Sequence, residues 1–185
     1  MGTGGWIVLG LIVVVVIWVI ATYNGLVSRR NQSQNAWSQI DVQLKRRHDL
    51  IPNLVQVVKD AMSYEQETLK TVIEARNRAV AATGPAQASV AEAALSEATG
   101  KLLMLMENYP TLKANDNVMQ LQEELTATEN KISFARQFYN DSVMGLNNAV
   151  QSFPGNLIAG RFGFTTGQFF DVPETEKAVP QVKLR

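Results

Sequence analysis

The organisation of this chain is decided by residues 6–23, which read WIVLGLIVVVVIWVIATY. None of these eighteen residues is charged, and twelve of them are Leu, Ile or Val. An α-helix of this length spans roughly 27 Å, close to the hydrocarbon thickness of a bilayer, and its apolar residues favour insertion by several kcal/mol. The rings of Trp6, Trp18 and Tyr23 are of the kind that lies at the headgroup level. Residues 1–23 are therefore predicted to form a membrane anchor.

The alternative for this segment is a cleaved signal peptide. Its leader, MGTGG, contains no basic residue, whereas signal peptides begin with a positively charged region. The apolar run is also longer than the usual hydrophobic region of a signal peptide and lacks a clean A-x-A site. These features favour an uncleaved anchor.

Basic residues predict the orientation of the anchor. None precedes the apolar run, whereas Arg29 and Arg30 follow it closely and Lys45, Arg46 and Arg47 lie further along. Because Lys and Arg are enriched on the cytoplasmic side of membrane proteins, the body is predicted to face the cytoplasm. A single anchor with few flanking charges leaves a periplasmic body as the alternative.

The composition limits the classes of function. The 185 residues include 17 Lys and Arg against 17 Asp and Glu, so no overall field draws the chain to nucleic acid, and no nucleic-acid partner is expected. Cysteine is absent, which excludes disulfides, a thiolate nucleophile and a Cys-ligated metal. The length that remains after the anchor suits one domain of ordinary size.

Beyond the anchor, apolar residues recur at steps of three and four, the spacing of one helix face. The first series comprises Trp37, Ile40, Leu44, Ile51, Leu54, Val58, Met62, Leu69, Val72 and Ala79. It predicts one long helix with a coiled-coil-like apolar stripe. Pro52 lies inside the series, and because the stripe keeps its phase across this residue, we expect a kink near Leu50 rather than two helices.

A turn and a second helix follow. Thr83, Gly84 and Pro85 predict a turn within residues 81–87, since these residue types end one helix and position the next. The next apolar series predicts a helix over residues 88–109, which Pro110 ends.

The third predicted helix has the most regular stripe in the chain. Its stripe positions are Val118, Leu121, Leu125, Thr128, Ile132, Ala135, Tyr139, Val143, Leu146, Val150 and Phe153. Asn117, with Gln120 three residues later, is the predicted N-cap. The sequence Phe153-Pro154-Gly155 is expected to end the helix, because proline fixes φ and lacks an amide donor.

These elements predict an all-α fold, in which a transmembrane helix (1–23) precedes an elongated antiparallel helical bundle with long coiled-coil-like helices (24–153). Residues 154–185 are predicted to be an irregular tail that contains aromatic residues. Two arrangements of the bundle fit: three helices that run up, down and up, which we favour, or a long hairpin whose second arm is the last two helices in series. Either leaves apolar stripes partly uncovered, so a homo-oligomer is expected.

The search for catalytic and metal-ligating residues finds no recognised arrangement. His48 is the only histidine, so neither a His-His metal pair nor a conventional histidine dyad with Ser can form within one chain. We therefore predict no catalytic residue, no cofactor and no metal, and we do not expect an enzyme. The cluster of Arg46, Arg47, His48 and Asp49 has two interpretations, a solvated helix face or a contact for an anion or a partner protein.

The tail is unusually aromatic. Leu157, Phe162 and Phe164 lie in the stretch LIAGRFGF, and Phe169 and Phe170 follow it. We expect these rings to be buried against the bundle or a neighbouring subunit. The alternative is a docking contact of Phe162 and Phe164 with another protein or with the membrane surface.

Several longer motifs stand out along the chain. The longest are YNGLV at residues 23–27 and AWSQIDVQLKRRHDLIPNLV at 36–55; others are ENYPTLKA at 107–114, ENKI at 129–132, ARQFYN at 135–140, FP at 153–154 and FGF at 162–164. Together these motifs resemble the LemA family, and the resemblance covers nearly the whole chain. One departure is Tyr64-Glu65, which stands where the family commonly has a His-Glu pair, so a metal or proton role of that histidine is not expected here.

The resemblance implies a bacterial inner-membrane protein with one N-terminal span, an α-helical body and no established enzymatic activity, in membrane organisation or envelope stress. The leading hypothesis is a structural protein that self-associates into a scaffold at this membrane. The alternative, from another class, is a binding module or adaptor for a membrane protease or sensor, which would use residues 45–49 or the aromatic tail.

Overall fold

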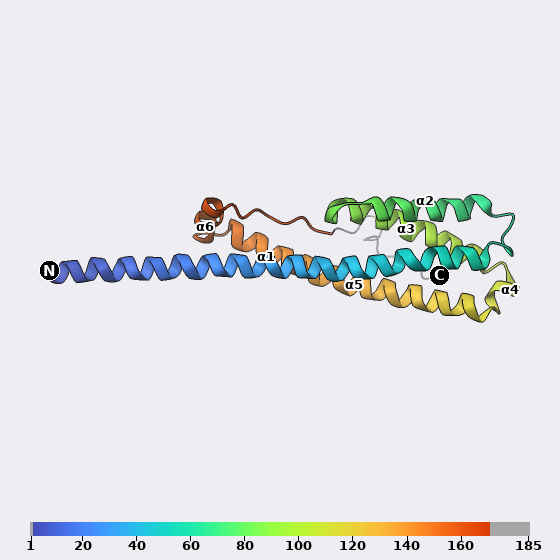
Figure 1. The fold of residues 1–185 in the computed structure, drawn as a ribbon, viewed down its shortest axis with the longest axis horizontal. Coiled ribbons are helices and arrows are strands. Elements are labelled where there is room, and N and C mark those ends of the chain that lie inside the picture. The colour runs from blue at the N-terminus through green and yellow to red at the C-terminus, as the bar shows by residue number, and fades with distance from the viewer. Residues whose placement is uncertain (1, 171–185) are drawn as a thin grey trace, which may run out of the picture. The chain divides into compact units, whose positions relative to one another are not determined.

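The computed structural model describes residues 2–170 and is entirely helical apart from connections. Its helices are α1 (Thr3–Val58), α2 (Gln66–Ala81), α3 (Gly84–Met106), α4 (Pro110–Lys113), α5 (Asp116–Gln151) and α6 (Gly155–Phe162), as Figure 1 shows. No β-strand occurs in this described part of the chain, which confirms the all-α prediction.

The described residues fall into two compact units. The anchor unit comprises residues 2–38 with Phe138–Gln168, and the bundle unit comprises Gln39–Gln137 with residues 169–170. Because α1 and α5 are long, each contributes residues to both units.

The anchor unit contains the apolar run of α1. An 18-residue window of this helix has a mean hydropathy of 2.8, and none of it is buried by other parts of the protein. By length and composition α1 is able to cross a membrane. Further along α1, Leu26 is buried against Ile158, Ala159 and Phe164.

The end of α5 and the segment after α6 are held together by polar contacts in the same unit. The Asn147 side chain accepts a hydrogen bond from the Gly167 amide at 2.7 Å and donates one to the Gly167 carbonyl at 3.1 Å. The Tyr139 hydroxyl donates to the Gln168 carbonyl at 2.7 Å, and its ring lies 5.4 Å from that of Trp37. Burial raises the pKa of Tyr139 above its ordinary value.

The prediction of an irregular tail is wrong for residues 155–162, which form α6. Pro154 and Gly155 do end α5, but the chain becomes helical again because Ile158 and Ala159 gain burial on one face of a new helix. The new helix ends at Gly163, whose φ of 71° is left-handed and favours glycine. The tail prediction for residues 171–185 lies outside the described residues.

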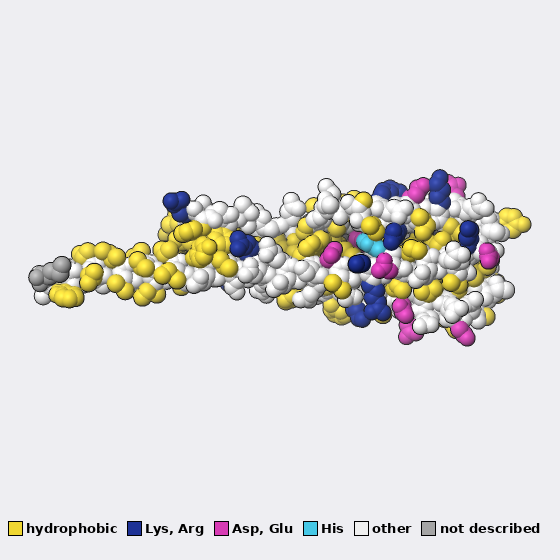
Figure 2. Space-filling view, in the orientation of Figure 1, with side chains coloured by type: hydrophobic (Ala, Val, Ile, Leu, Met, Phe, Trp, Pro, Cys, Tyr) yellow, Lys and Arg dark blue, Asp and Glu magenta, His cyan; other side chains and the backbone are white. Residues whose placement is uncertain are grey.

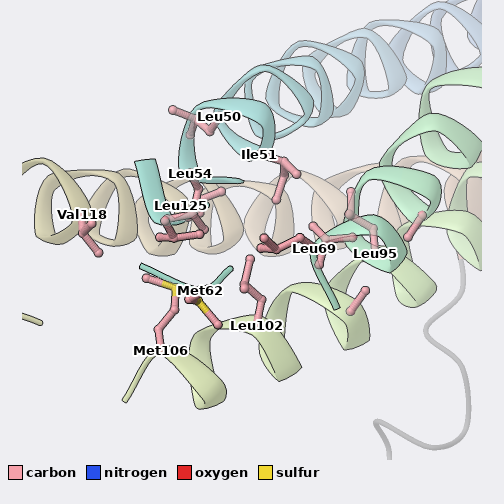
Figure 3. Packing of buried hydrophobic residues seen from close by; sticks show 14 of the residues in the cluster. Leu50, Ile51, Leu54, Met62, Leu69, Leu95, Leu102, Met106, Val118 and Leu125 are labelled. Atoms are coloured by element: carbon pink, nitrogen blue, oxygen red, sulfur yellow. The ribbon is translucent and has the colours of Figure 1, made fainter. Parts of the chain in front are cut away.

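The bundle unit consists of four helical segments that run side by side, each reversing the direction of the one before (Figure 1). They are the C-terminal part of α1, then α2, α3 and the N-terminal part of α5, with the single turn α4 between the last two. All of them contribute to one hydrophobic core, in which Ile51, Leu54, Met62, Leu95 and Leu102 are fully buried (Figure 3). Both predicted bundle arrangements therefore contain one helical segment too few.

The fourth segment arises because the first predicted helix is broken at residues 59–65. The helix continues through Pro52, as expected, but it ends at Val58 and α2 begins at Gln66. Met62 is fully buried in the connection, and its amide donates to the Val58 carbonyl. The reversal lets Leu69 and Val72 pack back on the core, which a straight helix would leave in solvent.

The other helix boundaries agree with the sequence patterns to within a few residues. α2 ends at Ala81, and α3 starts at Gly84, whose φ of 74° is left-handed and favours glycine. Pro85 follows in the first turn of α3. The predicted N-cap of the next long helix is wrong. The side chain of Asn115, not Asn117, accepts the amides of residues 117 and 118, because α5 already begins at Asp116.

Candidate functional site: a buried charge cluster

The most unusual chemistry of the bundle unit is a group of charged side chains inside it. Arg47 and His48 lie on α1, and Glu92 and Ser96 lie on α3. The side chains of Arg47 and Glu92 are only 5% and 6% exposed, and their closest polar atoms, Nη1 and Oε2, are 3.2 Å apart. The other oxygen of Glu92 lies 2.5 Å from His48 Nε2, and Arg47 Nη2 donates to Ser96 Oγ at 2.8 Å. We call these four residues the buried charge cluster.

A fifth residue, Glu129 on α5, pairs with Arg47 of the cluster. Glu129 Oε2 also lies 3.2 Å from Arg47 Nη1, and its side chain is about half exposed. A buried guanidinium is tolerated only when carboxylates and hydrogen bonds replace its hydration, and here two carboxylates and one hydroxyl do so. The cluster therefore joins three helical segments at one level of the bundle.

Pro52 links the cluster to α2 as well. A proline at this position cannot donate to the carbonyl of residue 48, four residues earlier, so the helix leaves that oxygen without its usual partner. The Nε of Arg76, on α2, donates to the His48 carbonyl at 3.1 Å. An arginine from a neighbouring helix thus satisfies the acceptor that Pro52 leaves open.

A pocket of about 330 Å³ opens beside the cluster, between α1, α3 and α5 of the bundle unit. Its walls combine Arg47, Ser96 and Glu129 with the apolar side chains of Leu103 and Leu125. Thr99 also lines it, and its buried hydroxyl has no hydrogen-bond partner within the described structure. Among residues 2–170, no group of three or more His, Asp or Glu side chains is placed to hold a metal ion.

The arrangement connects side chains of neighbouring helices. Arg47 and His48 each contact a different oxygen of Glu92, and all three side chains are buried. Charged groups of this kind have one satisfied geometry, so they fix how α1 and α3 align more narrowly than apolar packing does.

Comparison with known proteins identifies the family to which this chain belongs. A sequence model of the LemA family matches residues 36–184. The chain belongs to the LemA family. The matched range includes all residues of the buried charge cluster.

Individual relatives of this LemA-family chain are distant. The magnetosome proteins MamQ 2 of Paramagnetospirillum magneticum and MamQ of Magnetospirillum gryphiswaldense are each 22% identical to it, over 86% and 82% of the chain and 68% and 65% of those proteins. The protein LemA of Metamycoplasma hominis is 25% identical, over 83% of the chain and 71% of that protein. Together with the apolar α1, the family indicates a membrane-associated helical protein.

The structure corrects the interpretation of the basic residues 46–48 in this LemA-family chain. Arg47 and His48 do not form a solvated face, because the fold buries both; whether they contact a partner stays a prediction. Arg46 does lie outside, where it pairs with Glu124 at 3.6 Å. Of these three residues, Arg46 is the most exposed to an adaptor contact.

One signal in the sequence could have revealed the cluster. Glu92 falls on the buried face of α3, in step with Ala88, Leu95, Thr99 and Leu102. A carboxylate on an apolar face needs a buried cation, and Arg47 and His48 lie between Leu44 and Ile51 on the corresponding stripe of α1.

The remaining predicted site residues lie in the anchor unit. Trp6 is largely exposed on α1, and Trp18 and Tyr23 are exposed to a lesser and nearly equal extent. The ring of Tyr23 makes edge contacts with Phe162 at 5.0 Å and Phe164 at 5.6 Å between centroids. Phe164 is buried and Phe162 is not, so the packing interpretation of the tail describes the first and leaves the second open.

Proposed function

We propose that this LemA-family chain is a structural protein, held by α1 in the bacterial inner membrane, whose copies self-associate into a scaffold through the outer face of the bundle unit. The body faces the cytoplasm in this proposal, because Arg29 and Arg30 directly follow the apolar run. The likeness to proteins named for the magnetosome supports a role in membrane organisation.

The observation that carries self-association is the exposure of Phe134. This ring on α5 is 74% exposed and lies on the side of the helix opposite to buried Ile132 and Thr128. α1 and α5 run antiparallel with Arg47 facing Glu129, which brings exposed Val42 to the level of Phe134. Large apolar side chains left exposed at one level of the bundle favour a protein partner, and a second copy of the chain is always present.

The argument for self-association differs from the one that the sequence suggested. The apolar stripe of α5 is not left open, since Val118, Leu125, Thr128 and Ile132 are buried within the protein itself. A coiled coil between copies along this stripe is therefore not what we propose. The candidate contact is the opposite side of the same helix.

The test is the mass distribution of the full-length protein in mild detergent and in nanodiscs. We expect oligomers for the wild type and a shift towards monomer when Phe134 and Val42 are both replaced by Ser. Lys101→Ser, on the exposed side of α3, is the matched control and should leave the distribution unchanged. A wild type that is monomeric at all accessible concentrations would refute the scaffold.

A further inference from the structure

The helix α6 is positioned at the point where the apolar run of α1 ends. Its buried residues Ile158 and Ala159 pack with Leu26, and Val19 and Val27 border the same cluster. Figure 1 shows α6 nearly end-on beside α1, so the short helix lies across the long one. A helix that crosses a membrane span at its end has the orientation of a helix lying in the plane of the membrane surface.

Apolar side chains around α6 remain uncovered by the protein. More than half of the surface of Phe153, Leu157 and Phe162 is exposed. Figure 2 shows hydrophobic side chains along the N-terminal part of α1 that continue onto the surface beside it, where Figure 1 places α6. The exposed surface of α6 is thus continuous with the surface of α1 that would contact lipid.

The charges of this unit fit the headgroup region. Residues 2–38 and 138–168 contain three arginines, Arg29, Arg30 and Arg161, against one acidic residue, Asp141, although the whole chain is formally neutral. Arg161 lies in the last turn of α6, and the guanidinium of Arg30 lies 5.3 Å from the centre of the Phe164 ring. Cations beside apolar and aromatic groups are what anionic lipid headgroups attract.

We propose that α6 is a membrane-surface helix, which lies at the boundary of headgroups and acyl chains in the leaflet that α1 leaves. Phe153, Leu157 and Phe162 contact the acyl chains, and the three arginines contact lipid phosphates. The edge contacts of Tyr23 with Phe162 and Phe164 then lie beside α1 at the end of its membrane-spanning part. This inference rests on the membrane anchoring of α1 in the proposed function.

The test uses fluorescent labels on single cysteines, which are unique because the chain has none of its own. The full-length protein is placed in nanodiscs that contain anionic lipid brominated near the headgroup for the α6 labels, or in the middle of the acyl chain for the span label, since bromine quenches only fluorophores in contact with it. Labels at Phe153→Cys and Leu157→Cys report α6, Val13→Cys reports the span, and Glu123→Cys, exposed on α5 in the bundle unit, is the aqueous control.

We expect strong quenching at Val13 and at one or both α6 positions, and none at Glu123. Quenching at Val13 without quenching at either α6 position would overturn the surface helix but leave the anchor standing. The same conclusion would follow if the α6 labels were shielded from an aqueous quencher without being quenched by lipid, because a protein would then cover them. Absence of quenching at Val13 as well would overturn both the anchor and the surface helix.

Discussion

Among single residues, Glu92 has the largest predicted effect on stability. Its carboxylate contacts both Arg47 and His48 in the protein interior. Loss of a partner from a buried ion pair costs more than the pair contributed, because the remaining charge stays desolvated. The half-exposed Glu129 compensates Arg47 only in part, since solvent screens it.

We therefore expect Glu92→Gln to lower the free energy of unfolding by about 3 kcal/mol, the lower part of the range for a broken buried pair. The measurement is thermal unfolding of the full-length protein in detergent, followed by circular dichroism. Glu97→Gln, five residues further along α3, is the control. Its hydrogen bond and charge interaction with Lys101 lower the pKa of Glu97, but this pair lies at the surface and should matter little. Equal effects of the two substitutions would contradict a structural role for the cluster.

At the scale of elements, the bundle unit shows how a proline inside a helix is accommodated by another helix. Pro52 deprives the His48 carbonyl of its donor, and Arg76 supplies one from α2. If this account is right, the two residues are energetically coupled, because an alanine at position 52 would restore the amide.

A double-mutant cycle measures this coupling. Arg76→Met should lower stability by about 1.5 kcal/mol, the lower value for a hydrogen bond from a charged donor. In the Pro52→Ala background the same substitution should cost clearly less, since the helix then satisfies the carbonyl itself. Unfolding midpoints of the four proteins in denaturant give the interaction energy, and an additive cycle would disprove the compensation.

Most elements were predictable because helix periodicity, and the prolines and glycines that end helices, are local signals. Gly84-Pro85 and Pro110 mark real boundaries, and Val118, Leu125 and Ile132 of the predicted α5 stripe do share a buried face. The break at residues 59–65 was missed because it contains neither glycine nor proline, and the apolar spacing happens to keep its phase across it. Periodicity reports which residues share a face and says nothing about a reversal of direction.

The site was less predictable than the fold for a related reason. Charges on a helix usually face water, so Arg47 and His48 were interpreted from their own neighbours in sequence. Their partner Glu92 is 45 residues away from Arg47, and only the packing of α3 against α1 brings it there. α6 was missed because eight residues bordered by proline and glycine give too short a periodic signal.

For the whole molecule, the decisive property is whether α1 is embedded in a bilayer. Its twelve Leu, Ile and Val residues between 6 and 23 favour insertion by about 4 to 7 kcal/mol on an insertion scale, and a central arginine costs about 2.5 to 3.5 kcal/mol on the same scale. One arginine would therefore be tolerated, and two would cancel most of the favourable free energy of insertion.

We expect the wild type to stay with the membrane during alkaline carbonate extraction, and the double variant Val13→Arg with Val16→Arg to be released in large part. Val13→Leu with Val16→Leu is the control, because it keeps the run apolar. Immunoblots of pellet and supernatant give the fractions. Retention of the arginine variant at the wild-type level would mean that another part of the chain holds it in the membrane.

The buried charge cluster also has a consequence for the order in which the protein folds during synthesis. α1 leaves the ribosome with Arg47 and His48 already in place, but Glu92 follows Arg47 only after a further 45 residues. Until Glu92 has been synthesised, Arg47 has no carboxylate on α3 to pair with. Packing this face of α1 against another segment before then would bury an unpaired charge, which is energetically costly. Closure of the bundle must therefore wait for translation of α3, which leaves time for the apolar N-terminal segment to reach the membrane first.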